Sequence, residues 1–139
     1  MTRYVLDTDT LTLLQEGHPA VSRRFLNEPQ EDVAITVLSI EEQLSGWYTQ
    51  VRKAKKPERL AWAYRRLGET VRFFSRMQIW TYDVPAMERF EQLRKAKVRI
   101  GRSDLRIAAT TLLHGAVLVT RNSRDFKKVP GLRTEDWSL

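Results

Sequence analysis

Short apolar runs alternate with longer amphipathic stretches along the whole chain. Runs rich in β-branched and aromatic residues predict strands at 3–6, 32–38, 78–84 and 116–121, and "RTEDW" at 133–137 predicts a short fifth strand. Helices are expected between them, at 8–15, 19–28, 39–53, 57–74, 85–98 and 103–114. Strands alternating with helices favour a parallel sheet with helices on both faces. A chain of 139 residues predicts one such domain, spanning residues 1–139.

The amphipathic helices indicate which side chains should reach the core. In the helix beginning at Pro57, apolar residues recur at spacings of three and four, so we expect one buried stripe of Leu60, Tyr64, Leu67, Val71 and Phe74. The same pattern predicts inward positions elsewhere for Val21, Phe25, Leu26, Met87, Phe90, Leu93 and Val98. Most aromatic residues follow such stripes. The adjacent pair Trp47 and Tyr48 fits the core least well.

Acidic residues follow several of the predicted strands. Asp7 ends the first strand, Glu41 and Glu42 come after the second, and Asn122 and Asp125 come after the strand at 116–121. Asp104 stands in the first turn of the preceding helix. Because sites in parallel α/β folds form beyond the carboxyl ends of the strands, these side chains could gather at one edge of the sheet.

Each acid also has a structural interpretation. Asp7 or Asp9 could cap the first helix, and Ser39 with Glu42 fits a capping box. Asp104 suits the start of a helix, and Asp125 suits a turn. Capping does not explain why apolar runs lead into acid three times, however. Carboxylates brought together without His or Cys are typical ligands of Mg²⁺ and Mn²⁺, which can activate water against a phosphodiester.

Other chemistries have less support. The chain has no cysteine, which excludes disulfides and thiolate metal sites, and His18 and His114 are too isolated to form a catalytic pair. Neither of the glycine-rich phosphate-binding motifs, GxxxxGK followed by Ser or Thr and GxGxxG, occurs in the chain. No leader-like N-terminus and no membrane-length apolar run is found, so we expect a cytoplasmic protein without a membrane segment.

The net charge of +7 is concentrated in one segment. Between Arg52 and Arg76 there are nine basic residues and two acidic ones, whereas the remainder of the chain is neutral. Such a segment attracts a polyanion such as nucleic acid. A solvated helix face explains the same pattern, and the sequence leaves both interpretations open.

Three motifs, in order and correctly spaced, resemble the PIN-domain ribonucleases, specifically the VapC-type toxins of bacterial toxin–antitoxin pairs. They are "YVLDTDTLTLL", "SIEEQLSG" and "IGRSDLRIAATTLLHGAVLVTRNSRDFKKVPGL". The resemblance covers nearly the full length. It implies a three-layer αβα sandwich, RNA cleavage dependent on Mg²⁺ or Mn²⁺, homodimerisation and a cognate antitoxin.

The resemblance also implies roles for individual residues. Asp7, Glu42 and Asp104 would bind the metal, and the register of the second motif selects Glu42 over Glu41. Asn122 departs from the family pattern, which often has Asp there, so Asp125 would supply charge through water. Thr120 could hydrogen-bond a ligand or the phosphate. From the basic segment, and not from the resemblance, we expect RNA contacts by Lys53, Lys55, Lys56 and Arg59.

Two other interpretations remain. The Asp7-Thr8-Asp9 sequence resembles the start of haloacid-dehalogenase-type phosphatases, although Leu11 departs from their pattern and their later acid pair is missing. A PIN domain without nuclease activity, which binds RNA or a partner protein, is the second alternative. Asn122 is the residue that favours it.

Overall fold

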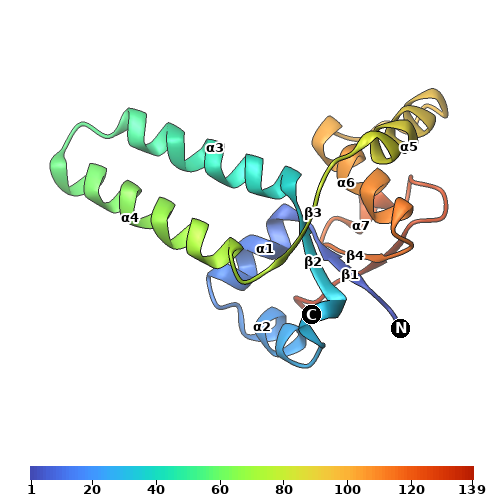
Figure 1. Ribbon diagram of the computed structural model, residues 1–139, viewed down its shortest axis with the longest axis horizontal. Helices are drawn as coiled ribbons and strands as arrows, with labels where there is room; N and C mark the ends of the chain where they lie inside the picture. The colour runs from blue at the N-terminus through green and yellow to red at the C-terminus, as the bar shows by residue number, and fades with distance from the viewer.

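The computed structural model describes residues 1–139, which form a five-stranded sheet (Figure 1). The strands are β1 (Tyr4–Leu6), β2 (Val33–Thr36), β3 (Gln78–Trp80), β4 (Val117–Val119) and β5 (Arg133–Glu135). Their order in the sheet is β3-β2-β1-β4-β5, and every neighbouring pair is parallel. The prediction of a parallel sheet is therefore confirmed.

Seven helices connect the strands. They are α1 (Thr8–Gln15), α2 (Pro19–Leu26), α3 (Val37–Lys53), α4 (Pro57–Phe74), α5 (Val84–Lys95), α6 (Arg102–Leu113) and α7 (Ser123–Phe126). Proline stands in the first turn of α2, α4 and α5, where its missing N–H costs no hydrogen bond. After α6 the chain turns at Gly115, whose φ of 62° lies in the left-handed region that favours glycine. None of these helices combines the length and the apolar character needed to cross a membrane.

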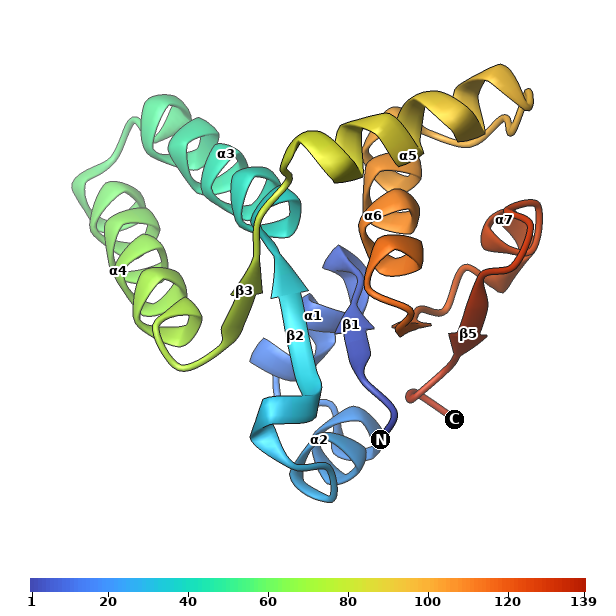
Figure 2. The ribbon, with the colours of Figure 1, turned by 45° about the vertical axis from the view of Figure 1, so that its right-hand side comes forward.

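Both faces of the sheet are buried, because successive residues of each central strand join different apolar clusters. Leu6 and Ile35 belong to a cluster with residues of α1 and α2, whereas Val5 and Ala34 belong to a cluster with residues of α5 and α6. The sheet is thus the middle of three layers, as the αβα sandwich requires (Figure 2).

Helices α3 and α4 form a long antiparallel hairpin that projects from one side of the domain (Figure 1). Because α4 packs chiefly against α3, it buries only a narrow face, formed by Ala63, Thr70 and Phe74. The predicted stripe is therefore wrong at Tyr64 and Val71, which are 56% and 51% exposed.

Two other predicted core positions are also wrong. Met87 is 47% exposed, because α5 turns Ala86, Phe90 and Leu93 toward α6 and leaves Met87 on its outer side. Leu26 is 78% exposed, since it is the last residue of a short helix whose inward side is formed by Val21 and Phe25.

The second strand ends earlier than the apolar pattern predicts. Thr36 is the N-cap of α3, where its hydroxyl accepts a hydrogen bond from the Ser39 N–H at 3.3 Å. The apolar Val37 and Leu38 already belong to the helix, so the predicted capping box of Ser39 and Glu42 is wrong. Likewise, the third strand ends at Trp80, and Asp83 caps α5. Because Thr36, and not Ser39, caps α3, Glu42 has no capping role.

Candidate active site

A polar cavity of about 550 Å³ lies at the carboxyl end of the central strands, and we call it the acidic cavity. No apolar residue lines it. The lining residues are Asp7, Thr8, Asp9, Thr12, Glu42, Asp104, Arg121 and Asn122. The structure thus brings together four of the five predicted catalytic residues, from the segments after β1 and β4 and from α3 and α6. Asp125 is not among the lining residues.

Asp7 is buried directly after β1 and is the N-cap of α1. Its Oδ1 accepts a hydrogen bond from the Thr10 N–H at 2.8 Å, so the capping interpretation holds for Asp7. Burial raises the pKa of Asp7, hydrogen bonds from Thr120 and Thr10 oppose this, and the charge of Asp9 adds to it. Capping and a place in the cavity are therefore compatible.

Asp104 is half-buried in the first turn of α6. Its pKa is raised first by burial and then by the negative charges of Asp7, Glu42 and Asp125. Three acids from different segments of the chain therefore act electrostatically on Asp104. Their mutual repulsion is the physical property that a bound cation would relieve.

The raised pKa of Asp104, caused first by burial and then by the neighbouring charges, predicts a pH-dependent stability change for Asp104→Asn. The folded-state pKa of Asp104 lies above its ordinary value of 3.8, so the folded protein binds this proton more tightly than the unfolded chain. Stability therefore falls as the pH rises from about 3.8 through the folded-state pKa. Asp104→Asn has no carboxyl group to lose a proton at position 104, so it lacks this loss of stability. In a chelator, which removes bound cations, the variant should melt at a higher temperature than the wild type at neutral pH.

Melting curves recorded from acidic to neutral pH check this expectation. The advantage of Asp104→Asn should disappear below the ordinary pKa of the carboxylate, where both proteins carry an uncharged group. A lower melting temperature of the variant at neutral pH would instead assign Asp104 a stabilising role at the start of α6.

Glu42 lies on the exposed surface of α3, in its second turn, and faces α6. Its Oε1 accepts a hydrogen bond from the hydroxyl of Ser103. Helices α1 and α3 are held together beside it, since the hydroxyls of Thr8 and Ser39 lie 2.8 Å apart. Glu41 lines no part of the cavity. Of the two neighbouring glutamates, only Glu42 therefore lines the acidic cavity.

The segment after β4 contributes an amide rather than a second carboxylate. Asn122 Nδ2 donates to Asp125 Oδ2 at 3.0 Å, and Lys128 lies 3.7 Å from the other oxygen of Asp125. Thr120 is only 1% exposed, and its hydroxyl accepts from the Asn122 N–H at 2.9 Å. Thr120 therefore has little surface to offer RNA, in contrast to the RNA contact that we expected of it. Its hydroxyl is instead hydrogen-bonded to Asp7 and Asn122.

Sequence reasoning missed the ion pair between Asp9 and Arg121. Arg121 Nε and Nη2 donate to the two carboxylate oxygens of Asp9 at 2.7 and 3.1 Å. It also missed Ser103, the partner of Glu42. Nothing in the local pattern indicates either pairing, because the residues come from segments far apart in the chain.

The predicted RNA-binding lysines lie away from the acidic cavity. Lys53, Lys55, Lys56 and Arg59 are exposed at the tip of the α3–α4 hairpin. Lys53 lies eleven residues beyond Glu42 on α3, which is about 16 Å along the helix axis. Contacts at the tip would therefore involve an RNA that extends well beyond the acidic cavity.

The donor set of the acidic cavity suits a hard cation. Its carboxylate and amide oxygens are the ligand type of Mg²⁺, which keeps several waters and needs only one or two direct carboxylates. As the side chains stand, no three His, Cys, Asp or Glu residues are grouped so that they could hold a metal ion together. Glu42 is instead hydrogen-bonded to Ser103, and Asp9 is paired with Arg121. The residues fit a hydrated ion approached by a few carboxylates.

Comparison with known proteins identifies the class to which this fold and cavity belong. Residues 4–132 match the family model of the PIN domain. The chain therefore belongs to the PIN domain family, and the phosphatase interpretation of Asp7 and Asp9 is set aside.

Individual relatives are similar over the full length. The tRNA(fMet)-specific endonuclease VapC of Shigella flexneri is 32% identical over 142 residues, covering 99% of this chain and 100% of the relative. The protein of the same name from Salmonella typhimurium is 30% identical over 141 residues, covering 99% of each.

Solved structures of toxin–antitoxin complexes also contain chains that match this one over nearly the full length. A chain of the DNA-bound VapBC complex from Salmonella typhimurium matches with a TM-score of 0.78 at 30% identity, covering 99% of each chain. A chain of a toxin–antitoxin complex from Klebsiella pneumoniae matches with a TM-score of 0.70 at 26% identity, covering 93% of this chain and 94% of that one.

Proposed function

We propose that this protein is an endoribonuclease that depends on Mg²⁺ or Mn²⁺ and acts as the toxin of a toxin–antitoxin pair. The observation that carries the proposal is the acidic cavity, which Asp7, Glu42 and Asp104 line and in which burial, followed by the charges of Asp7 and Glu42, raises the pKa of Asp104. The similarity to proteins named VapC endonucleases supports RNA as the substrate.

In this proposal Asp7, Glu42 and Asp104 hold the cation, and Asn122 and Asp125 act on it through water. A bound Mg²⁺ would supply an activated water and stabilise the leaving oxygen of the phosphodiester. Thr10 and Thr120 keep Asp7 oriented toward the cavity. To bind the cation, Glu42 gives up the hydrogen bond that it accepts from Ser103. Ser103 therefore acts as a reversible restraint on the Glu42 carboxylate.

Similarity to toxin–antitoxin complexes leads us to propose an antitoxin protein as the partner of this chain. We also propose a homodimer, as the family resemblance implies, and a cytoplasmic location, where RNA is the available substrate. Sedimentation of the purified protein tests the dimer, because a monomeric mass at micromolar concentration contradicts it.

The proposed activity is tested by incubating the purified protein with RNA and Mg²⁺. Internal cleavage of the RNA is the expected result, with no hydrolysis of a phosphomonoester. RNA binding without any cleavage would instead favour the alternative of a PIN domain that acts only as a binding module. Asn122→Asp would then be the substitution to make.

The basic tip of the α3–α4 hairpin should contribute to RNA affinity through phosphates. Reversing Lys53, Lys55 and Lys56 to Glu is expected to weaken RNA binding and to flatten its dependence on salt, with little change in sequence preference. Binding isotherms at several salt concentrations measure this. The same three substitutions should leave the melting temperature nearly unchanged, since all three lysines are exposed. Unchanged RNA binding would assign these lysines to a solvated helix face.

A further inference from the structure

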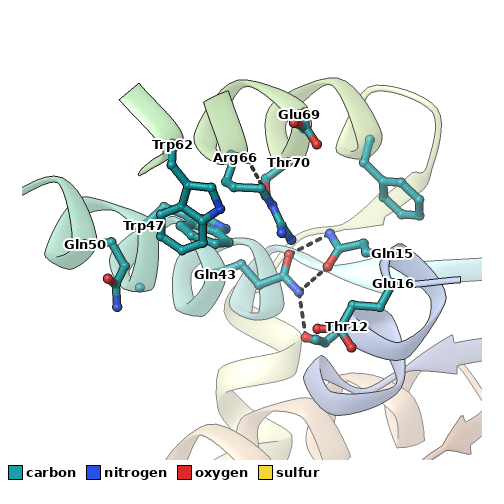
Figure 3. Close-up of a pocket in the computed structure, with 12 residues that line it drawn as sticks. Thr12, Gln15, Glu16, Gln43, Trp47, Gln50, Trp62, Arg66, Glu69 and Thr70 are labelled. Carbon is teal, nitrogen blue, oxygen red and sulfur yellow. Dashed lines mark hydrogen bonds between the residues drawn. The ribbon is translucent and has the colours of Figure 1, made fainter. Parts of the chain in front are cut away.

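A second cavity, of about 580 Å³, lies between α1, α3 and α4, and we call it the tryptophan cavity (Figure 3). This volume is within the range of small-molecule sites. Thr12 lines both this cavity and the acidic cavity. The two cavities are therefore neighbours.

Two indoles and the guanidinium group of Arg66 form one end of the tryptophan cavity, and Arg59, which does not line the cavity, covers Trp62. The rings of Trp47 and Trp62 meet edge to face, with centroids 5.3 Å apart and an interplanar angle of 73°. Arg59 lies over Trp62 at 4.1 Å, and Arg66 lies over Trp47 at 5.0 Å. Aromatic rings and guanidinium planes are the groups on which proteins stack unpaired RNA bases.

The other end of the cavity is formed by side-chain amides (Figure 3). Gln43 and Gln15 exchange two hydrogen bonds of 2.8 Å, and Gln43 also donates to the hydroxyl of Thr12 at 3.1 Å. Beyond these bonds, Gln15 keeps one amide N–H and each carbonyl oxygen keeps a second lone pair, and these can pair with the edge of a base. These amides come from α1 and α3, the helices that border the acidic cavity.

The lining is poorly suited to an apolar protein segment. Only three of its twelve residues, Trp47, Trp62 and Phe73, are apolar. The lining itself carries Arg66 against Glu16 and Glu69. The attraction for RNA comes from the surrounding segment from Arg52 to Arg76, which carries nine basic residues against two acidic ones.

We infer that the tryptophan cavity binds one unpaired nucleobase of the RNA substrate, close to the phosphate that occupies the acidic cavity. The base packs against the indoles of Trp47 and Trp62 and the guanidinium of Arg66, and the glutamine amides contact its edge. This inference rests on the proposed ribonuclease function and adds a preference for single-stranded RNA, since a paired base cannot enter.

The test measures binding of a short single-stranded oligoribonucleotide to the full chain in the cleavage-deficient Asp7→Asn background. Trp62→Leu keeps an apolar side chain against Trp47 but removes the aromatic face, whereas Trp62→Phe restores one. Tyr64→Leu is the matched control, because Tyr64 is an exposed aromatic residue of the same helix that does not line the cavity. Melting temperatures verify that all variants are folded.

Trp62→Leu is expected to weaken binding roughly 5-fold or more, the lower end of what loss of one base stack causes, with Trp62→Phe close to the parent. The RNA is also changed to an abasic site at each position in turn. One position should matter for the parent protein and not for Trp62→Leu. That loss of coupling locates the base in the cavity.

Equal binding by folded Trp62→Leu and Tyr64→Leu would overturn the inference while leaving the ribonuclease proposal intact. Loss of antitoxin binding rather than RNA binding in Trp62→Leu would also overturn it, and would assign the cavity to the protein partner. If the parent chain neither binds nor cleaves RNA, the proposed function fails first and the inference fails with it.

Discussion

Asp7→Asn is expected to lower RNA cleavage by roughly 10²- to 10⁴-fold, the effect of losing several kcal/mol of charge stabilisation by a metal. The substituted side chain is nearly isosteric with aspartate, and its amide oxygen can still accept the cap hydrogen bond from the Thr10 N–H. Removing a buried carboxylate whose pKa is raised should not reduce stability. The loss of activity should therefore occur in a folded protein, as melting curves can verify.

Asp9→Asn is the matched control for Asp7→Asn. Asp9 lies two residues away and lines the same cavity, but it is half-exposed and paired with Arg121. An exposed pair of this kind contributes little to stability, because water and salt screen the two charges. We expect Asp9→Asn to retain most of the cleavage rate. If both folded variants were equally inactive, the assignment of Asp7 as the metal ligand of this pair would be wrong.

Glu42→Gln should cause a second large loss of RNA cleavage, on the order of 10²-fold or more, for the same electrostatic reason. The glutamine keeps the size of the side chain and can still accept the hydrogen bond from Ser103. Position 42 is exposed on α3, so the melting temperature should change little.

Glu41→Gln is the control for Glu42→Gln, because it removes the same charge from the neighbouring residue. Glu41 does not line the acidic cavity, and this variant should cleave RNA at nearly the wild-type rate. Initial rates of the two variants, measured on one RNA, decide between the two glutamates. A greater loss in Glu41→Gln than in Glu42→Gln would contradict the assignment.

Features fixed by local pattern could be predicted from the sequence. Apolar runs indicated the parallel strands, because burial on both faces requires nearly continuous apolar character. The position of Asp7 followed from the same logic, since a polar residue after a buried strand must lie at the end of the sheet. The proximity of Asp104 followed from its place in the first turn of a helix that leads into the next strand.

Features fixed by tertiary packing could not be predicted. The apolar stripe of α4 suggested burial of Tyr64 and Val71. However, the α3–α4 hairpin projects away from the sheet, and α3 covers only part of that stripe. The cap at Thr36 was hidden, because Val37 and Leu38 suit a strand as well as a helix. The Asp9–Arg121 pair and the contact of Trp47 with Trp62 join different segments and leave no local signal.

The central claim is that a cation held by the acidic cavity is responsible for RNA cleavage. Mn²⁺ titration, with bound ion followed by electron paramagnetic resonance and RNA cleavage followed in the same samples, tests it most directly. Both signals should reach half of their maximum at the same Mn²⁺ concentration, both should be abolished by excess EDTA, and both should be strongly reduced in Asp104→Asn. Undiminished cleavage in EDTA, or cleavage by Asp104→Asn at the wild-type rate, would contradict the claim.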